Sequence, residues 1–265
     1  MAEAGIARLR LKKVLVWILA LVALGYLSAT AWLYFKQREM LYFPPLPLAA
    51  PQGEAFDLQS QGLKLHGWVI NPGNKAALLF FGGSAESVER EAAFFRANLP
   101  DISVYLIPYR GYSGNPGTPT EAGLFADALT AYDYVAAHHP GVAIMGRSLG
   151  TGVAMYVAVK RPVASVVLVT PYDSIENIAQ DQYPEFPVRL LMKDKYESWR
   201  RAPLVHEPTL VLIAADDTVV PRKYTEHLIS TFTSPPQVVV IDHADHTTIL
   251  GKPEYAAAIR KFLSP

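Results

Sequence analysis

The chain has 265 residues, of which 51% are hydrophobic, and no composition break divides it, which suits one large α/β domain. Its 24 basic and 24 acidic residues cancel and form no basic stripe, so nucleic acid is excluded as an expected partner. The absence of cysteine excludes disulfides, thiolate nucleophiles and Cys-ligated zinc.

Residues 14–35 form an uncharged, strongly apolar segment. As an α-helix this segment would extend about 33 Å, roughly the hydrocarbon thickness of a bilayer, so it predicts a transmembrane anchor. More basic residues precede the segment than follow it. This asymmetry favours a cytoplasmic N-terminus at residues 1–13 and places the remainder of the chain outside the cytoplasm.

Two alternatives to a retained anchor stay open. The tripeptide Ala29-Thr30-Ala31 resembles a signal-peptidase site, and cleavage after Ala31 would release a secreted or periplasmic protein. A buried core helix is the other alternative, although core helices rarely lack charge over this length. Residues 36–54 follow as a linker, because Pro44, Pro45 and Pro47 favour an extended connector.

Residues 55–265 alternate between short apolar strands and amphipathic helices, which is typical of a single α/β domain. Strands are predicted at residues 55–58, 63–70, 76–81, 103–107, 142–145, 165–169, 209–214 and 237–241, and helices at 86–99, 120–138, 149–160, 222–231 and 254–262. The strands read as continuous apolar runs, so we expect a mostly parallel central sheet with helices on both faces.

Ligands of such sheets bind beyond the carboxyl ends of the strands, so the loops that follow the strands are where chemistry is expected. Four of these loops carry notable side chains or glycines. In chain order they are Gly82-Gly83-Ser84, Ser148, Asp216-Asp217 and His243-Ala244-Asp245-His246. After the glycine-rich loop, the order is therefore serine, acid, histidine.

Ser148 stands in Gly146-Arg147-Ser148-Leu149-Gly150, between a predicted strand and a predicted helix. A strand that turns directly into a helix strains the corner residue, and the flanking glycines remove side chains that would collide there. The turn exposes the serine hydroxyl and aims free amides of the helix N-terminus at the space above it. Ser148 is therefore the candidate nucleophile.

A serine nucleophile requires an imidazole base, and the imidazole requires a carboxylate that fixes its tautomer. We expect His246 as the base because its loop gives it reach toward Ser148, with His243 as the alternative. We expect Asp217 as the acid, with Asp216 as the alternative, because Asp217 lies just before a proline that starts a helix. Packing or surface roles are expected for the other histidines, which are His66, His138, His139, His206 and His227.

Taken together, the motifs resemble those of α/β-hydrolases, and specifically of the membrane-anchored serine hydrolases that include lysophospholipases and protein depalmitoylases. The matching segments are Tyr109-Arg110-Gly111-Tyr112-Ser113-Gly114, Gly123-Leu124-Phe125-Ala126-Asp127-Ala128, Gly146-Arg147-Ser148-Leu149-Gly150, Asp217-Thr218-Val219-Val220-Pro221 and His243-Ala244-Asp245-His246. The resemblance runs from about residue 40 to the C-terminus. It implies an α/β-hydrolase fold and a triad of Ser148, Asp217 and His246.

One loop departs from the pattern. Where the family usually has His-Gly-Asn-Ala, this chain has Phe81-Gly82-Gly83-Ser84. Backbone amides stabilise the oxyanion, so a changed side chain is compatible with the function. We expect the amides of Leu149 and Gly83 as donors, with Ser84 as the alternative for the second.

Residues 174–203 are rich in aromatic side chains and are expected either to cap the serine with an apolar acyl-binding wall or simply to cover the sheet. Arg110 and Asp127 are expected to form a structural ion pair. The predicted activity is hydrolysis of carboxylic esters or thioesters of lipid or acyl substrates, without metal or organic cofactor. Amide or peptide hydrolysis and a non-catalytic membrane-bound binding protein are the alternatives.

Overall fold

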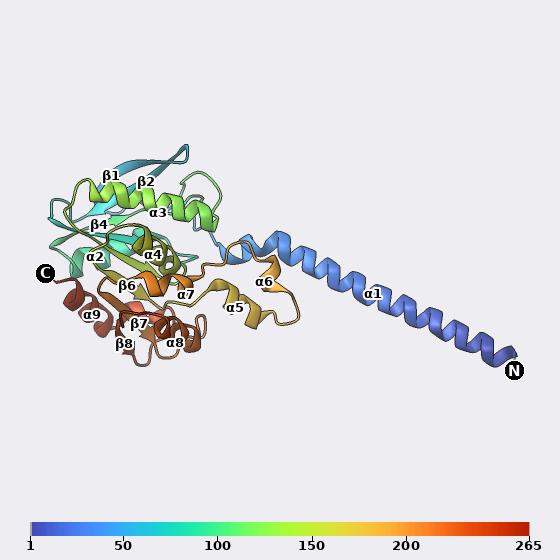
Figure 1. The fold of residues 1–265 in the computed structure, drawn as a ribbon. Coiled ribbons are helices and arrows are strands. Elements are labelled where there is room, and N and C mark those ends of the chain that lie inside the picture. Colours follow the sequence, from blue (N-terminus) through green and yellow to red (C-terminus); the bar gives the residue numbers. More distant parts are fainter. Residues whose placement is uncertain (1, 265) are drawn as a thin grey trace.

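A computed structural model describes residues 2–264. Helix α1 (Ala2–Leu41) projects from a domain that contains the rest of the chain (Figure 1). The helix continues six residues beyond the predicted end of the membrane segment at residue 35. Residues 36–41 contain good helix formers, and Lys36 pairs with Glu39 one turn later at 2.8 Å, so the helix extends through the start of the expected linker.

The domain is built on an eight-stranded sheet in the order β1-β2-β4-β3-β5-β6-β7-β8. Strand β2 pairs antiparallel with β1 and β4, and all other neighbours are parallel. The strands are β1 (Glu54–Ser60), β2 (Leu63–Ile70), β3 (Ala76–Phe81), β4 (Ile102–Leu106), β5 (Val142–Arg147), β6 (Val166–Val169), β7 (Thr209–Ala214) and β8 (Gln237–Ile241). This arrangement confirms the predicted, mostly parallel sheet of an α/β-hydrolase fold.

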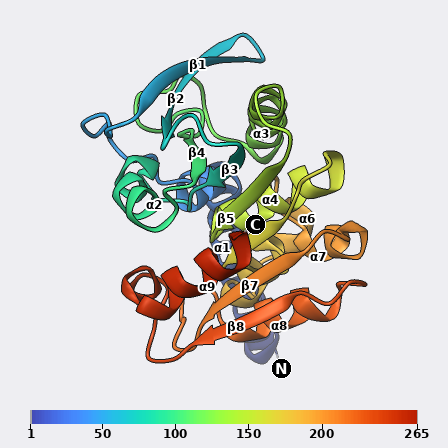
Figure 2. The ribbon, with the colours of Figure 1, turned by 90° about the vertical axis from the view of Figure 1, so that its left-hand side faces the viewer.

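Helices cover both faces of the sheet, and each face has its own apolar cluster (Figure 2). Along β3, Leu79 and Phe81 point to one cluster and Leu78 and Phe80 to the other, as the period of a strand requires. The first cluster contains residues of α3 (Glu121–Ala136), α4 (Leu149–Lys160) and α8 (Arg222–Ser230), and the second contains residues of α2 (Ala92–Asn98) and α9 (Pro253–Leu263).

The predicted helix at residues 86–99 is shorter in the structure. A 3-10 turn, Val88–Glu91, precedes α2, and the loop before that turn leads back to the end of β3. Two further 3-10 turns lie at Ala202–Leu204 and Thr248–Gly251. Glu86, which was predicted to begin the helix, instead lies in the loop before the 3-10 turn.

Residues 174–203, here called the cap, form three short helices between β6 and β7: α5 (Ile175–Gln182), α6 (Val188–Leu191) and α7 (Ser198–Arg201). Ser174 caps α5 by accepting a hydrogen bond from the Asn177 amide at 3.0 Å. Helices α5 and α6 lie beside the part of α1 nearest the domain (Figure 1), and residues of all three helices line one cavity together with Ser148. The cap and α1 therefore both border the predicted site.

Candidate active site

Ser148 stands at the corner between β5 and α4 with φ 48° and ψ −119°, a strained conformation for a residue with a side chain. Two glycines make this corner possible. A Cβ at Gly146 would overlap the carbonyl of Gly150, and a Cβ at Gly150 would overlap the carbonyl of Phe81. Because these backbone atoms lie in contact, only glycine fits at both positions.

The structure brings Ser148, His246 and Asp217 together from the carboxyl ends of β5, β8 and β7. His246 Nε2 lies 3.0 Å from Ser148 Oγ, and His246 Nδ1 lies 2.7 Å from Asp217 Oδ2. The His246 side chain is 13% exposed and that of Asp217 is 4% exposed. With its proton on Nδ1, the imidazole donates to Asp217 and leaves Nε2 free to accept the serine proton.

The carboxylate of Asp217 is held in place by the chain that follows it. Its Oδ1 accepts hydrogen bonds from the amides of Val219 and Val220 at 2.9 and 2.8 Å. This leaves Oδ2 directed at His246. The loop therefore fixes the orientation of the Asp217 carboxylate independently of its hydrogen bond to His246.

The alternative triad residues are not part of this hydrogen-bonded line. Within residues 2–264, the His243 side chain forms no hydrogen bond with Ser148, and the Asp216 side chain forms none with His246. Asp245 accepts hydrogen bonds from the amides of Thr248 and Thr247, which lowers the pKa of its exposed carboxyl. Asp245 thus closes the turn after His246 and positions that loop.

The loop after β3 lies beside the serine, because a Cβ at Gly83 would stand 3.6 Å from that of Ser148. The Gly83 amide donates to Glu86 Oε2 at 2.5 Å. Within the described chain, the amides of Leu149 and Ser84 have no hydrogen-bond acceptor. Ser84 and Leu149 also line the same cavity as Ser148. Of the two amides predicted for the second oxyanion donor, Ser84 is therefore the one without a partner.

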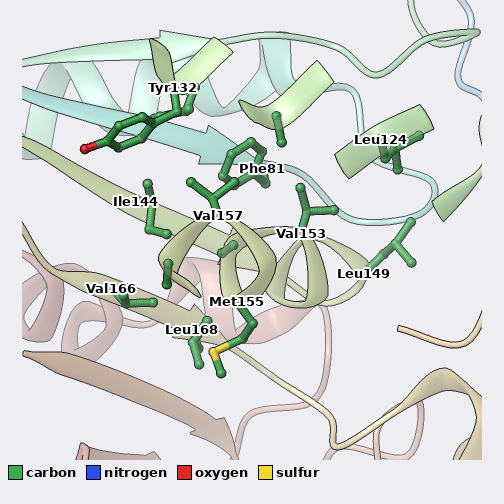
Figure 3. Close-up of a cluster of buried hydrophobic side chains, with 14 of the residues drawn as sticks. Phe81, Leu124, Tyr132, Ile144, Leu149, Val153, Met155, Val157, Val166 and Leu168 are labelled. Carbon is green, nitrogen blue, oxygen red and sulfur yellow. The ribbon is translucent and has the colours of Figure 1, made fainter. Parts of the chain in front are cut away.

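Phe81, the residue that departs from the family pattern, is 4% exposed and belongs to the core. Figure 3 shows its ring among the buried side chains that include Leu149 and Val153. The side chain therefore supports the base of the site, and the phenylalanine leaves the space above Ser148 unobstructed.

A buried charged cluster adjoins the site, and sequence reasoning missed it. Glu86 Oε1 lies 3.0 Å from Arg147 Nη1, and Arg147 Nη2 donates to the His246 carbonyl at 3.2 Å. Glu91 completes the cluster: burial, followed by the neighbouring Glu86 carboxylate, raises the pKa of Glu91 to about 8. Of these cluster residues, only Arg147 stood in a motif of the sequence, at the unspecified position between Gly146 and Ser148.

Arg110 and Asp127 form the expected structural ion pair. The Nε and Nη2 atoms of Arg110 each lie 2.7 Å from an oxygen of Asp127, and both side chains are largely buried. The guanidinium also packs against Gly123, where a Cβ would collide with it. These two motif residues join α3 to the loop after β4 rather than reaching the serine.

A cavity of about 820 Å³ opens above Ser148. Its lining combines the domain-proximal part of α1, the cap helices α5 and α6, and the residues 218–220 after β7. A volume of this size suits a drug-sized or acyl-chain ligand.

Comparison with known proteins relates the chain over nearly its whole length to an uncharacterized mycobacterial protein and, at lower identity, to a protein named as a hydrolase. It is 35% identical to the uncharacterized protein Rv2307c of Mycobacterium tuberculosis over 265 residues, covering 93% of this chain and 94% of that protein. It is 22% identical to human alpha/beta hydrolase domain-containing protein 17B, covering 73% of this chain and 68% of that protein. No protein-family model matches the chain.

The fold also matches a solved enzyme. The Pyrococcus furiosus esterase Pf2001 superposes with a TM-score of 0.67 at 17% sequence identity, covering 83% of this chain and 98% of that chain. At this identity the match shows the fold and leaves the substrate open.

We predict that Gly150→Ala lowers the free energy of unfolding by roughly 2 kcal/mol or more, because the new methyl group meets backbone that cannot move away. Urea denaturation of the detergent-solubilised protein measures this. Gly141→Ala is the matched control, since its Cβ would meet only Ala164 at 3.8 Å. Equal free energies of unfolding for Gly150→Ala and Gly141→Ala would contradict the close backbone contact at Gly150.

We predict that stability falls as the pH rises from about 4.5 to about 8, because native Glu91 retains a proton that the unfolded chain has released. This component amounts to at most roughly 1.4 kcal/mol per pH unit. Glu91→Gln removes it and flattens the curve, whereas the exposed Glu54→Gln leaves the slope unchanged. Parallel curves for wild type and Glu91→Gln, from urea titrations across this range, would show that Glu91 titrates normally.

Proposed function

We propose that the chain, which has the α/β-hydrolase fold, is a serine hydrolase that cleaves carboxylic ester or thioester bonds. The single observation that carries the proposal is the hydrogen-bonded line from Ser148 through His246 to Asp217. Three residues from distant loops meet in the geometry that activates a hydroxyl for acyl transfer.

In the proposed reaction, Ser148 Oγ attacks the acyl carbonyl while His246 Nε2 takes the hydroxyl proton. His246 then delivers this proton to the departing alcohol or thiol, and an ester bond to Ser148 remains. Water, deprotonated by the same imidazole, releases the carboxylic acid and restores the serine. Asp217 stays ionised and stabilises the imidazolium that forms twice in each cycle.

The oxyanion of each tetrahedral intermediate would be held by the Leu149 amide at the start of α4 and by a second amide from the loop after β3. The bond between Gly83 and Glu86 favours Ser84 as that second donor. The helix N-terminus adds a favourable dipole at the same point.

The burial of Phe81 in the core supports an active enzyme over a non-catalytic binding protein, because the departure from the family pattern does not obstruct the serine. The apolar cavity supports an acyl group as the substrate moiety. Amidases use the same triad chemistry, so the preferred leaving group is to be identified by comparing esters, thioesters and amides as substrates.

We also propose that α1 remains attached as a membrane anchor, with the N-terminus in the cytoplasm and the hydrolase domain outside it. One helix, within Leu9–Leu41, is long and apolar enough to cross a membrane, a property that a signal sequence shares. The contacts of α1 with the domain, analysed below, favour the anchor.

We predict that a fluorophosphonate probe labels the native protein and that Ser148→Ala abolishes labelling and lowers ester hydrolysis by at least about 10³-fold. The control is Ser230→Ala, which changes a surface serine on α8 and should keep both the labelling and the ester hydrolysis. Esters, thioesters and amides of graded acyl length, assayed on the same variants, identify the preferred bond. Labelling that survives in Ser148→Ala would move the nucleophile elsewhere, and an unlabelled wild type would overturn the proposed function.

We predict that Ser84→Pro lowers kcat by about 10²- to 10³-fold, because it removes the amide hydrogen proposed to meet the oxyanion. Proline suits this position, the second residue of the turn closed by Glu86 N and Gly83 O. Ser84→Ala is the matched control because it also loses the hydroxyl contact with Leu41 but keeps the amide. Full activity of the proline variant would return the role to Gly83.

A further inference from the structure

The cavity above Ser148 has one wall that belongs to the membrane helix. On α1 its lining begins at Thr30 and includes Leu33, and on the cap it includes Ile178, Phe186 and Leu191. The floor is formed by Ser148 and its neighbours. Figure 1 shows α5 and α6 lying along this stretch of α1. The cavity therefore runs from the serine into the space between the cap and a helix that is apolar enough to cross a bilayer.

Specific contacts hold α1 against the cap. The rings of Tyr26 and Phe186 stack with centroids 5.4 Å apart, and the Tyr26 hydroxyl donates to the Glu185 carbonyl at 3.0 Å. Farther along, Arg38 forms a paired hydrogen bond with Asp194 at 2.7 and 3.2 Å. A helix that served only as a tether would need no such contacts.

The end of α1 is also bonded to the loop that carries the proposed oxyanion donor. Ser84 Oγ donates to the Leu41 carbonyl at 2.8 Å, and the Phe43 amide donates to the Ser84 carbonyl at 3.2 Å. The Tyr42 hydroxyl lies 2.8 Å from that of Tyr196, with both rings buried. Membrane helix, cap and site are thus one packed unit.

The depth of the cavity points to its ligand. Thr30 lies five residues before the end of the span predicted at residue 35, or about 7 Å along the helix axis, so that end of the cavity lies within the hydrocarbon layer. Apolar side chains that line the cavity are left uncovered: Trp32 on α1 is 57% exposed and Phe43, just after the helix, is 53% exposed. Such an exposed apolar rim suits contact with lipid.

From this geometry, and resting on the proposed function, we propose that the space between α1 and the α5–α6 cap is an acyl-chain channel open to the bilayer. Its occupant is the acyl chain of a membrane lipid ester, which reaches Ser148 along α1 without leaving the membrane. A lipid already presents its chain at this depth, whereas an acylated protein would need a docking surface in addition. The channel also requires an uncleaved α1, because cleavage after Ala31 would remove Thr30 from its wall and Tyr26 from its contact with the cap.

The test uses the full chain reconstituted in phosphatidylcholine vesicles. Leu33→Trp should block the channel and lower the ratio of kcat/KM for a long-chain lipid ester over that for an acetate ester by about tenfold or more. Leu27→Trp is the matched control: the same substitution on an exposed, lipid-facing position of the same helix that does not line the cavity. It should leave the ratio and the activity unchanged.

An unchanged ratio in Leu33→Trp, with fluorophosphonate labelling intact in wild type, would overturn the channel and leave the proposed hydrolase standing. An absence of labelling in wild type would remove the hydrolase itself. A ratio that falls for a long-chain acyl-peptide thioester, while the lipid ester is not hydrolysed by wild type, would reject the lipid as occupant.

A second measurement locates the acyl chain of the lipid directly. Phosphatidylcholine carrying a photoreactive group in its acyl chain should cross-link, in Ser148→Ala vesicles, to peptides that contain residues 30–43 and 175–192. Cross-links confined to residues 9–29 would show that lipid surrounds α1 but does not enter between it and the cap, and would overturn the proposal.

Discussion

The backbone contact between the end of β3 and the first turn of α4 is the constraint on which the site depends. The Phe81 carbonyl lies where a Cβ of Gly150 would stand, so the strand and the helix approach as closely as two backbones permit. This contact holds Ser148 in its strained conformation and places the next loop beside it. The proposed nucleophile and the proposed oxyanion donors are therefore positioned by the same contact, and neither can shift alone.

Polar contacts around this point tie together segments that lie far apart in the sequence. Glu86 accepts from the Gly83 amide and pairs with Arg147, which in turn donates to the carbonyl of His246. Buried charges are costly unless they are paired and hydrogen-bonded, so such a cluster contributes little net stability. What it supplies is a fixed spatial relation between the loops after β3, β5 and β8, which together carry the serine, the histidine and the proposed oxyanion donors.

The sequence was sufficient for the sheet and for the meeting of Ser148, Asp217 and His246, because apolar strands and loops at their carboxyl ends follow from short-range patterns. It was insufficient for the partner of the Gly83 amide. That contact requires Glu86 to lie in a loop rather than in the helix predicted at residues 86–99, and the periodicity of the sequence does not indicate this. The orientation of Phe81 likewise follows only from the structure, in which its ring faces the core.

Helix α1 shows why the end of an apolar segment need not be the end of its helix. Through residue 29 its described side chains are exposed, as in a helix meant for lipid, whereas Thr30, Leu33 and Tyr34 are partly covered. From Gln37 on, polar side chains bond to the cap while the helix continues without a break. Hydropathy depends on the apolar side chains and ends the segment at residue 35, but the backbone hydrogen bonds of the helix do not depend on hydropathy. In the proposed topology the helix would pass from lipid into the protein, and its last turns pack against the domain.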